Sequence, residues 1–217
     1  MAVLSRLMVA IGGQLRHPFG LRGRLIAAAM AVANRGSNRI AINAIEIKPG
    51  ELVLELGCGS GHAIQALDAL RSAKCIFGID HSETMIEQAA RLNSAALRKN
   101  RVHLLRGGID ALPLRDNSVD KILVVHVVYF ADASAIREAR RVLRAGGRMI
   151  VVATDRAAMQ HWHLEDSHRL YDARVLARLL AEGGFAAREL TITPTKLAPG
   201  VRGLLAIAVK ESPANRE

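Results

Sequence analysis

Val53-Leu-Glu-Leu-Gly-Cys-Gly-Ser-Gly-His62 is the stretch that decides the fold. It begins as a mostly apolar strand and runs into Gly57, Gly59 and Gly61. Glycines at alternate positions let the backbone turn tightly and approach a ligand closely, and the helix expected next begins with unpaired N–H groups. The stretch predicts a nucleotide-sized crevice. A pyrophosphate is not indicated, because the dinucleotide fingerprint has its third glycine one residue later, where this chain has His62.

A second apolar run, Cys75-Ile-Phe-Gly-Ile79, ends in Asp80. An acidic side chain at this point can bind both hydroxyls of a ribose. One nucleoside is therefore expected in the crevice.

Strands and helices alternate after the first 45 residues, which predicts a doubly wound α/β sheet. Ser82 and Asp172 are good N-cap residues for two of the helices. The last two strands are expected to form an antiparallel pair. The expected strands are 51–57, 74–80, 101–106, 119–128, 148–154, about 185–193 and 203–210, and the expected helices are 61–72, 83–98, 133–144 and the segment from Asp172 to Gly183-Gly184.

At these residues the chain resembles the class I S-adenosylmethionine-dependent methyltransferases, of the type 11 kind that methylates small molecules or lipids. Their first motif, (Glu/Asp)-x-Gly-x-Gly-x-Gly, matches residues 55–61, and Asp80 matches the acid after their second strand. Leu112-Pro-Leu-Arg-Asp-Asn-Ser-Val-Asp120 and Ala139-Arg-Arg-Val-Leu-Arg-Ala-Gly-Gly147 resemble two later motifs of the family. The resemblance covers roughly residues 48–154. It implies a three-layer, doubly wound fold with a seven-stranded, mostly parallel sheet, an antiparallel last strand and additional N-terminal helices.

The resemblance also implies S-adenosylmethionine as cofactor. Glu55 is expected to reach the amino group of its methionine part, although a buried capping acid would look the same in sequence. Gly108 stands where the family usually has an Asp that binds adenine, so the Ile109 backbone and Asp110 are the candidates for that contact. The expected cofactor-binding residues are Glu55, Gly57, Cys58, Gly59, Gly61, Asp80, His81, Met85, Gly108, Ile109 and His126.

Two catalytic candidates lie at the end of the fourth strand. His126 is a candidate general base, because imidazole titrates near neutral pH and the carboxyl ends of the strands bind ligands. A satisfied core histidine and a plain cofactor contact are the alternatives. Tyr129 could turn an aromatic face toward the sulfonium or the acceptor. The expected substrate-facing residues are Tyr129, Trp162, His163, His168 and Tyr171.

No metal is expected. His161, His163, Glu165 and His168 could be ligands by residue type, but their spacing matches no defined zinc or iron pattern. The two cysteines, Cys58 and Cys75, are too few for a disulfide framework or a zinc site.

The 217-residue chain has a net charge of +10 and is half apolar, which suits one domain with a sizeable core. We expect a helical cap at 1–47, a methyltransferase domain at 48–211 and a tail at 212–217. The uncharged run 25–34 is too short to span a bilayer. A cytoplasmic protein is expected, with membrane contact as an option because six arginines precede the first acid, Glu46: Arg6, Arg16, Arg22, Arg24, Arg35 and Arg39.

Three functions remain open at this point. The first is methylation of N, O or S on a small-molecule or lipid-like acceptor. The second is an RNA methyltransferase or nucleic-acid binder, which the charge favours and the scarcity of aromatic residues disfavours. The third is a non-catalytic protein that binds adenosylmethionine.

Overall fold

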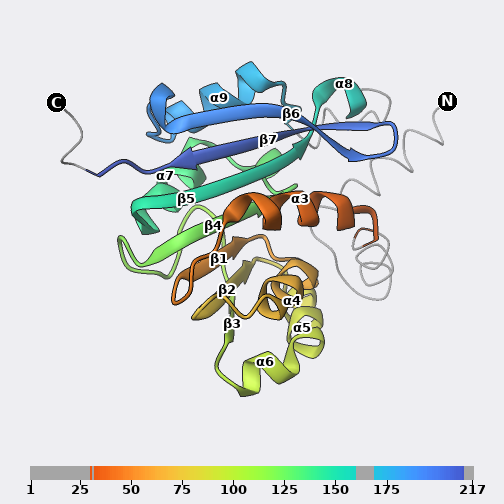
Figure 1. Ribbon diagram of the computed structural model, residues 1–217, viewed down its shortest axis with the longest axis vertical. Helices are drawn as coiled ribbons and strands as arrows, with labels where there is room; N and C mark the ends of the chain where they lie inside the picture. The colour runs from red at the N-terminus through yellow and green to blue at the C-terminus, as the bar shows by residue number, and fades with distance from the viewer. Residues whose placement is uncertain (1–29, 31, 160–168, 213–217) are drawn as a thin grey trace.

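Seven strands form one sheet in the order β3-β2-β1-β4-β5-β7-β6 in the computed structural model, which describes residues 30, 32–159 and 169–212 (Figure 1). β1 to β5 pair in parallel, and β7 is antiparallel to both of its neighbours, β5 and β6. The predicted fold class and the antiparallel final pair are thus confirmed. The strands are β1 (Leu52–Leu56), β2 (Cys75–Asp80), β3 (Val102–Arg106), β4 (Val119–Val125), β5 (Leu143–Thr154), β6 (Leu190–Ala198) and β7 (Val201–Val209).

Helices cover both faces of the sheet, because successive strand side chains point to opposite sides. In β4, Leu123 and Val125 join the core that includes α3, α4 and α6, whereas Ile122 and Val124 join the core that includes α7 and α9. The helices are α3 (Arg35–Ile45), α4 (His62–Ala69), α5 (Glu83–Leu92), α6 (Ser94–Arg98), α7 (Ala133–Val142), α8 (Arg156–Met159) and α9 (Ala173–Glu182), with 3-10 helices η1 (Val128–Phe130) and η3 (Ala187–Glu189).

Both predicted N-caps are confirmed. The Ser82 hydroxyl accepts a hydrogen bond from the N–H of Met85 at 3.4 Å, and the Asp172 carboxylate accepts one from the N–H of Val175 at 2.8 Å. Each side chain satisfies one of the N–H groups that a helix leaves unpaired at its start.

The single helix predicted over 83–98 is wrong. The chain forms α5 and α6 instead, with Asn93 between them. The Asn93 amide donates to the carbonyl oxygen of Ala89 at 2.9 Å and to that of Gly61 at 3.0 Å. A side chain that binds a helical carbonyl and a distant loop favours a break, because it competes with the helix's own hydrogen bonds.

Three strands also differ from the prediction by three residues or more. The strand expected over 119–128 ends at Val125, because His126 has a left-handed φ of 60° and η1 follows. β5 begins before residue 148, because the N–H of Gly146 donates to the Lys210 carbonyl and continues the pairing with the chain end. The strand expected at 185–193 lies at 190–198, because residues 187–189 form η3 and turn the Glu189 side chain inward.

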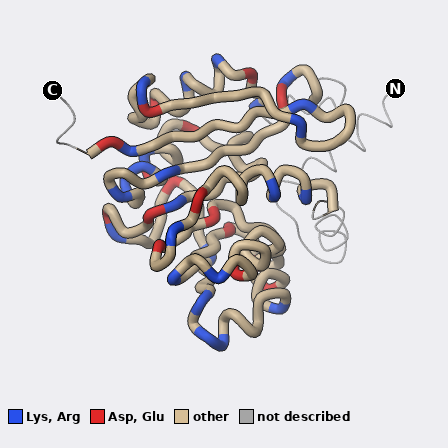
Figure 2. Tube along the Cα trace, viewed as in Figure 1, with Lys and Arg blue, Asp and Glu red and all other residues tan. Residues whose placement is uncertain are grey.

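α3 lies in the described part of the predicted N-terminal cap, and it packs across β4 and β5. Residues 1–29 and 31, the segment 160–168 and the tail from 213 lie outside the described residues. Within the ranges that are described, no helix is long and apolar enough to cross a bilayer. Among the same residues, Lys and Arg are spread over the molecule rather than gathered on one face (Figure 2).

Candidate active site

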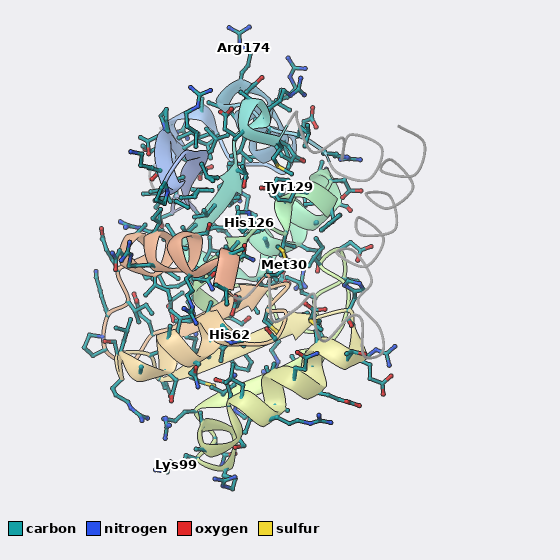
Figure 3. The ribbon with its side chains drawn as sticks, turned by 90° about the vertical axis from the view of Figure 1, so that its right-hand side faces the viewer. Met30, His62, Lys99, His126, Tyr129 and Arg174 are labelled. Atoms are coloured by element: carbon teal, nitrogen blue, oxygen red, sulfur yellow. The ribbon has the colours of Figure 1, made fainter. Side chains whose placement is uncertain are left out.

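The strand order reverses beside β1, which has β2 on one side and β4 on the other. In open α/β sheets, ligands bind outside the carboxyl ends of the strands at such a point. Figure 3 views this side of the molecule, where His62, Met30, His126 and Tyr129 follow one another. The loops after β1, β2 and β4 therefore form the candidate site.

The glycine loop after β1 is built from residues with positive φ, which is 65° at Gly57, 51° at Gly59 and 81° at Gly61. A Cβ at Gly57 would lie 2.3 Å from Cγ2 of Val127, so a larger residue would push apart the loops after β1 and β4. A Cβ at Gly59 would meet no atom of the described residues within 4 Å. The loop thus combines a tight turn with an open position, as the sequence predicted.

Asn93 holds this loop in place, a role that the sequence pattern did not indicate. Its amide donates to the Gly61 carbonyl, and a Cβ at Gly61 would lie only 2.6 Å from the amide nitrogen. Asn93 itself is buried. The only signal in the sequence was a polar residue within an otherwise regular helical pattern.

Glu55 lies on β1 next to α4, where the backbone N–H of Ile64 hydrogen-bonds to its carboxyl group. The residue is 5% exposed, and none of the described groups hydrogen-bonds to Oε2. Burial, and then the charge of Asp80, raise the pKa of Glu55 to about 8. A buried carboxyl oxygen without a partner is destabilising. The ammonium group of an amino-acid moiety would supply both the missing donor and the missing charge, whereas a purely structural acid leaves Oε2 unexplained.

Asp80 ends β2 and joins the glycine loop to α5. Its Oδ2 accepts a hydrogen bond from the N–H of Gly59 at 2.9 Å, and its Oδ1 accepts one from the N–H of Ser82 at 2.8 Å. A carboxylate offers about four lone-pair positions. Each oxygen therefore keeps an unused lone-pair position, and the ribose contact of Asp80 stays a prediction.

Three further predicted cofactor residues lie near the glycine loop and Asp80. Cys58 is buried beside Gly78, and burial raises the pKa of its thiol, which stays protonated near neutral pH. Met85 is buried in the first turn of α5. The His81 side chain is 48% exposed, with Nδ1 3.6 Å from Oδ1 of Asp80.

The loop after β3 brings the Asp110 side chain next to Gly108. A Cβ at Gly108 would lie 2.5 Å from Oδ1 of Asp110. The Asp110 carboxylate therefore occupies the space that a side chain at 108 would take. Ile109, between them, packs against the core under α7 and α9.

His126 occupies the end of β4, and both of its ring nitrogens have partners in the protein. Nε2 lies 2.8 Å from Oγ of Ser37 on α3, and Nδ1 lies 3.1 Å from the hydroxyl of Tyr129. Burial lowers the pKa of His126 to about 4, so the ring is neutral near pH 7. The arrangement resembles the satisfied core histidine more than the free base that the sequence also allowed. Nothing in the sequence pattern pointed to Ser37.

The two described tyrosines are buried. The Tyr129 hydroxyl accepts a hydrogen bond from the N–H of Thr154 at 2.6 Å, and its ring stacks on His126 and Tyr171. Tyr171 donates its hydroxyl proton to the Val128 carbonyl at 3.1 Å. Tyr171 is 2% exposed, so it lies in the core next to Tyr129.

Trp162, His163 and His168, predicted to face the substrate, lie outside the described residues. In the part of the chain that the structure describes, no group of three or more His, Cys, Asp or Glu residues could hold a metal ion.

Comparison with known proteins supports the same cofactor chemistry. The sequence profile of the methyltransferase-domain family of type 11 matches residues 54–151. The chain is 30% identical over 131 residues to YdaC of Bacillus subtilis, an uncharacterized methyltransferase, covering 59% of this chain and 70% of that protein. It is also 30% identical over 139 residues to Rv3030 of Mycobacterium tuberculosis, a probable S-adenosylmethionine-dependent methyltransferase, covering 61% of this chain and 48% of that one.

The fold has close counterparts among solved structures. One is a chain from the complex between the Haloferax volcanii Trm112 methyltransferase activator and a putative methyltransferase, with a TM-score of 0.72, 20% identity and coverage of 88% of this chain and 95% of that chain. At this identity the match shows the fold alone. The chain spans about half the length of several curated relatives that it matches.

Proposed function

The chain belongs to the class I S-adenosylmethionine-dependent methyltransferases, and from this premise we propose that it moves a methyl group to N, O or S of a small-molecule or lipid-like acceptor. The observation that carries the cofactor part of this proposal is the unpartnered Oε2 of buried Glu55 beside the glycine loop. Among the common parts of nucleotide cofactors, a cationic amino group is the best partner for this oxygen, because it supplies a hydrogen-bond donor and a positive charge.

The residues at the site fit adenosylmethionine. Glu55 would hold its ammonium group, and Asp80 would hold its ribose hydroxyls. Gly59 would leave space for its body, and Asp110, beside Gly108, would accept a hydrogen bond from its adenine amino group. When bound, the cofactor supplies a methyl group on a positively charged sulfur, which a nucleophile takes by in-line displacement. The protein's part is to align the acceptor and exclude water.

The distribution of the described basic residues supports the small-acceptor part of the proposal. Described Lys and Arg residues are dispersed along the trace (Figure 2), and Lys99 beside α6 and Arg174 on α9 lie at opposite ends of the molecule (Figure 3). This distribution favours a small acceptor over a nucleic acid, which needs a continuous basic track. We place the activity in the cytoplasm, and we add contact with an anionic membrane surface to the proposal because six arginines precede the first acid of the sequence.

The test supplies methyl-labelled adenosylmethionine and the purified protein to an extract of the source cells. Label is then counted in lipid, aqueous small-molecule and RNA fractions. The proposal predicts label in one of the first two fractions. Label in RNA would favour the nucleic-acid alternative, and tight cofactor binding with no label in any fraction would favour a non-catalytic binding protein.

Two variants control this experiment. Gly59→Arg projects a side chain into the open space of the site and should abolish labelling. Gly200→Arg, in the turn between β6 and β7, also has positive φ and open space around its Cβ position, and it should label like the unmodified protein.

A further inference from the structure

The first turn of α3 is fixed at two points. A Cβ at Gly36 would lie 1.9 Å from the carbonyl oxygen of Leu197 on β6, so only glycine lets the helix approach that strand. Ser37 follows and is buried on the same helix face as Ala41 and Ile45. A hydroxyl on an otherwise apolar buried face needs a hydrogen-bond partner, which His126 provides.

His126 has an unusual backbone as well as an unusual partner. It is a non-glycine residue with a φ of 60°, and its N–H donates to the Val152 carbonyl at 2.9 Å. A left-handed residue at the carboxyl end of a strand is strained, and such residues persist where the surroundings hold them and often where function requires it. The left-handed turn directs the chain into Val127, which packs on Gly57 of the glycine loop.

The contacts on either side of the ring form one continuous path. It runs from Ser37 through His126 and the Tyr129 hydroxyl to the backbone N–H of Thr154. A neutral imidazole has one N–H and one acceptor nitrogen, so it can donate to one hydroxyl and accept from the other. The path joins α3, the end of β4, η1 and the end of β5 at the candidate site.

We propose that His126 is a positioning residue. It links the first turn of α3 to the loop that follows β4 and thereby holds this loop in place as one wall of the methyl-transfer site. It acts through Ser37 and Tyr129 and takes no proton from the acceptor. The effect of this link on the reaction rests on the proposed methyltransferase function, because the position of the loop matters only if methyl transfer occurs beside it. The link itself can be measured without any acceptor.

The first test measures hydrogen exchange of the α3 amides in the full-length protein. Ser37→Ala and His126→Asn should each speed this exchange by about 3- to 10-fold, the factor for one intramolecular hydrogen bond. Asn suits the position because it tolerates positive φ. The double variant should be no faster than the more affected single variant, because both changes remove the same contact between α3 and residue 126. Ser94→Ala, at an exposed helix serine on α6, should leave α3 exchange unchanged. Additive effects, or no effect of Ser37→Ala, would overturn the link.

The second test separates positioning from base catalysis with labelled methyl transfer and with cofactor affinity measured by calorimetry. Positioning predicts that Ser37→Ala and His126→Asn lower the transfer rate by similar factors, with the same pH profile and a cofactor Kd within about threefold of the unmodified protein. A base predicts instead that His126→Asn abolishes the low-pH limb while Ser37→Ala has little effect, which would contradict the inference. If the unmodified protein does not bind the cofactor, the proposed function fails, while the exchange experiment still decides the link.

Nitrogen NMR of the histidine rings gives a third readout. The His126 signals, assigned by their loss in His126→Asn, should show one neutral tautomer between pH 6 and 8 and should shift in Ser37→Ala. A ring that titrates in this range would contradict the inference.

Discussion

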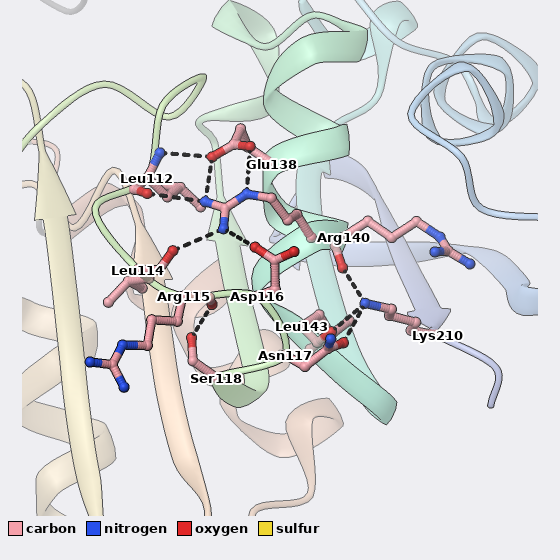
Figure 4. A network of polar contacts seen from close by, with 11 residues as sticks. Leu112, Leu114, Arg115, Asp116, Asn117, Ser118, Glu138, Arg140, Leu143 and Lys210 are labelled. Carbon is pink, nitrogen blue, oxygen red and sulfur yellow. Dashed lines mark hydrogen bonds and ion pairs between the residues drawn. The ribbon is translucent and has the colours of Figure 1, made fainter. Parts of the chain in front are cut away.

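At the amino ends of β4 and β5 the guanidinium of Arg141 makes five hydrogen bonds, whereas on β1, beside the glycine loop, Oε2 of Glu55 makes none with any described residue. A guanidinium has five N–H donors, so Arg141 is fully satisfied. Its partners are the Glu138 carboxylate, the Asp116 carboxylate and the carbonyls of Leu112 and Leu114 (Figure 4).

Both regions correspond to motifs that the sequence analysis singled out, yet their roles differ. The motif-like segments 112–120 and 139–147 bind each other through Arg141, and Lys210 joins them by donating to Asn117 and to two backbone carbonyls. The glycine motif leaves a buried acid incomplete. The comparison teaches that a side chain with every donor paired, such as Arg141, supports the fold, whereas an unpaired buried carboxyl oxygen beside a glycine loop points to a ligand. Nε of Arg140 is also buried without a partner among the described residues, but the same guanidinium is paired with Glu189 through Nη2.

The largest expected effect compares glycines on the two sides. Gly59 and Gly146 have φ values of 51° and 76°, and a Cβ at either meets no described atom within 4 Å. Gly59→Arg should weaken cofactor binding by about 100-fold or more, because overlap with a ligand and an unpaired buried cation each cost several kcal/mol. Gly146→Arg should leave binding unchanged. Calorimetry with S-adenosylhomocysteine measures both, and equal losses would refute the assignment of the site.

The next largest effect comes from replacing one glutamate with glutamine in each of the two regions. Glu55→Gln should weaken cofactor binding by about 10- to 100-fold, because it removes a charge-assisted hydrogen bond, and should raise the thermal midpoint of the free protein. Glu138→Gln should do the opposite, lowering stability by about 1–2 kcal/mol through its bonds to Arg141 and sparing binding. Thermal unfolding and binding calorimetry on both variants check that the effects on stability and on binding are opposite.

Stability against pH gives an intermediate effect. In the free protein Glu55 keeps its proton up to a pKa of about 8, whereas an unfolded Glu releases it near the ordinary value of 4.5. The folded state therefore binds more protons in this window, and the free energy of unfolding should fall as pH rises, by up to about 1.4 kcal/mol per pH unit from this group. Denaturant titrations at several pH values, with Glu55→Gln as reference, isolate the contribution. A curve identical to that of the variant would contradict it.

The smallest effect tests the hydrogen bonds of Arg141 alone. Arg141→Lys keeps the charge but replaces five fixed donors with three, so stability should fall by about 1–2 kcal/mol. Binding of the cofactor should stay within about twofold, since Arg141 lies at the far ends of the strands. Arg115→Lys, at an exposed position in the same loop, serves as the control with little change in either quantity.

The parts of the fold that could be predicted from sequence are those set by neighbouring residues. The strand, the glycine turn and the caps at Ser82 and Asp172 depend on local pattern and local hydrogen bonds, and these were confirmed. The break at Asn93 and the early start of β5 were missed, because each depends on a partner far along the chain: Gly61 in one case and Lys210 in the other.

The candidate site divides in the same way. Glu55, Gly59 and Asp80 stand close in sequence or at strand ends, so the sequence pattern alone predicts that they meet. The environment of His126 could not be predicted, because Ser37 lies 89 residues earlier. Residue type suggested a base, whereas burial and two hydroxyl partners decide how this ring behaves.

The most direct measurement of the central claim, that Glu55 is completed by a cationic amino group, is proton release on cofactor binding. The full-length protein is titrated with S-adenosylhomocysteine at pH 7 in buffers of different ionisation enthalpy. Glu55 is protonated in the free protein at this pH and must ionise to pair with an ammonium group. The account predicts release of about one proton per cofactor bound, lost in Glu55→Gln. Binding heats that do not depend on the buffer would contradict it.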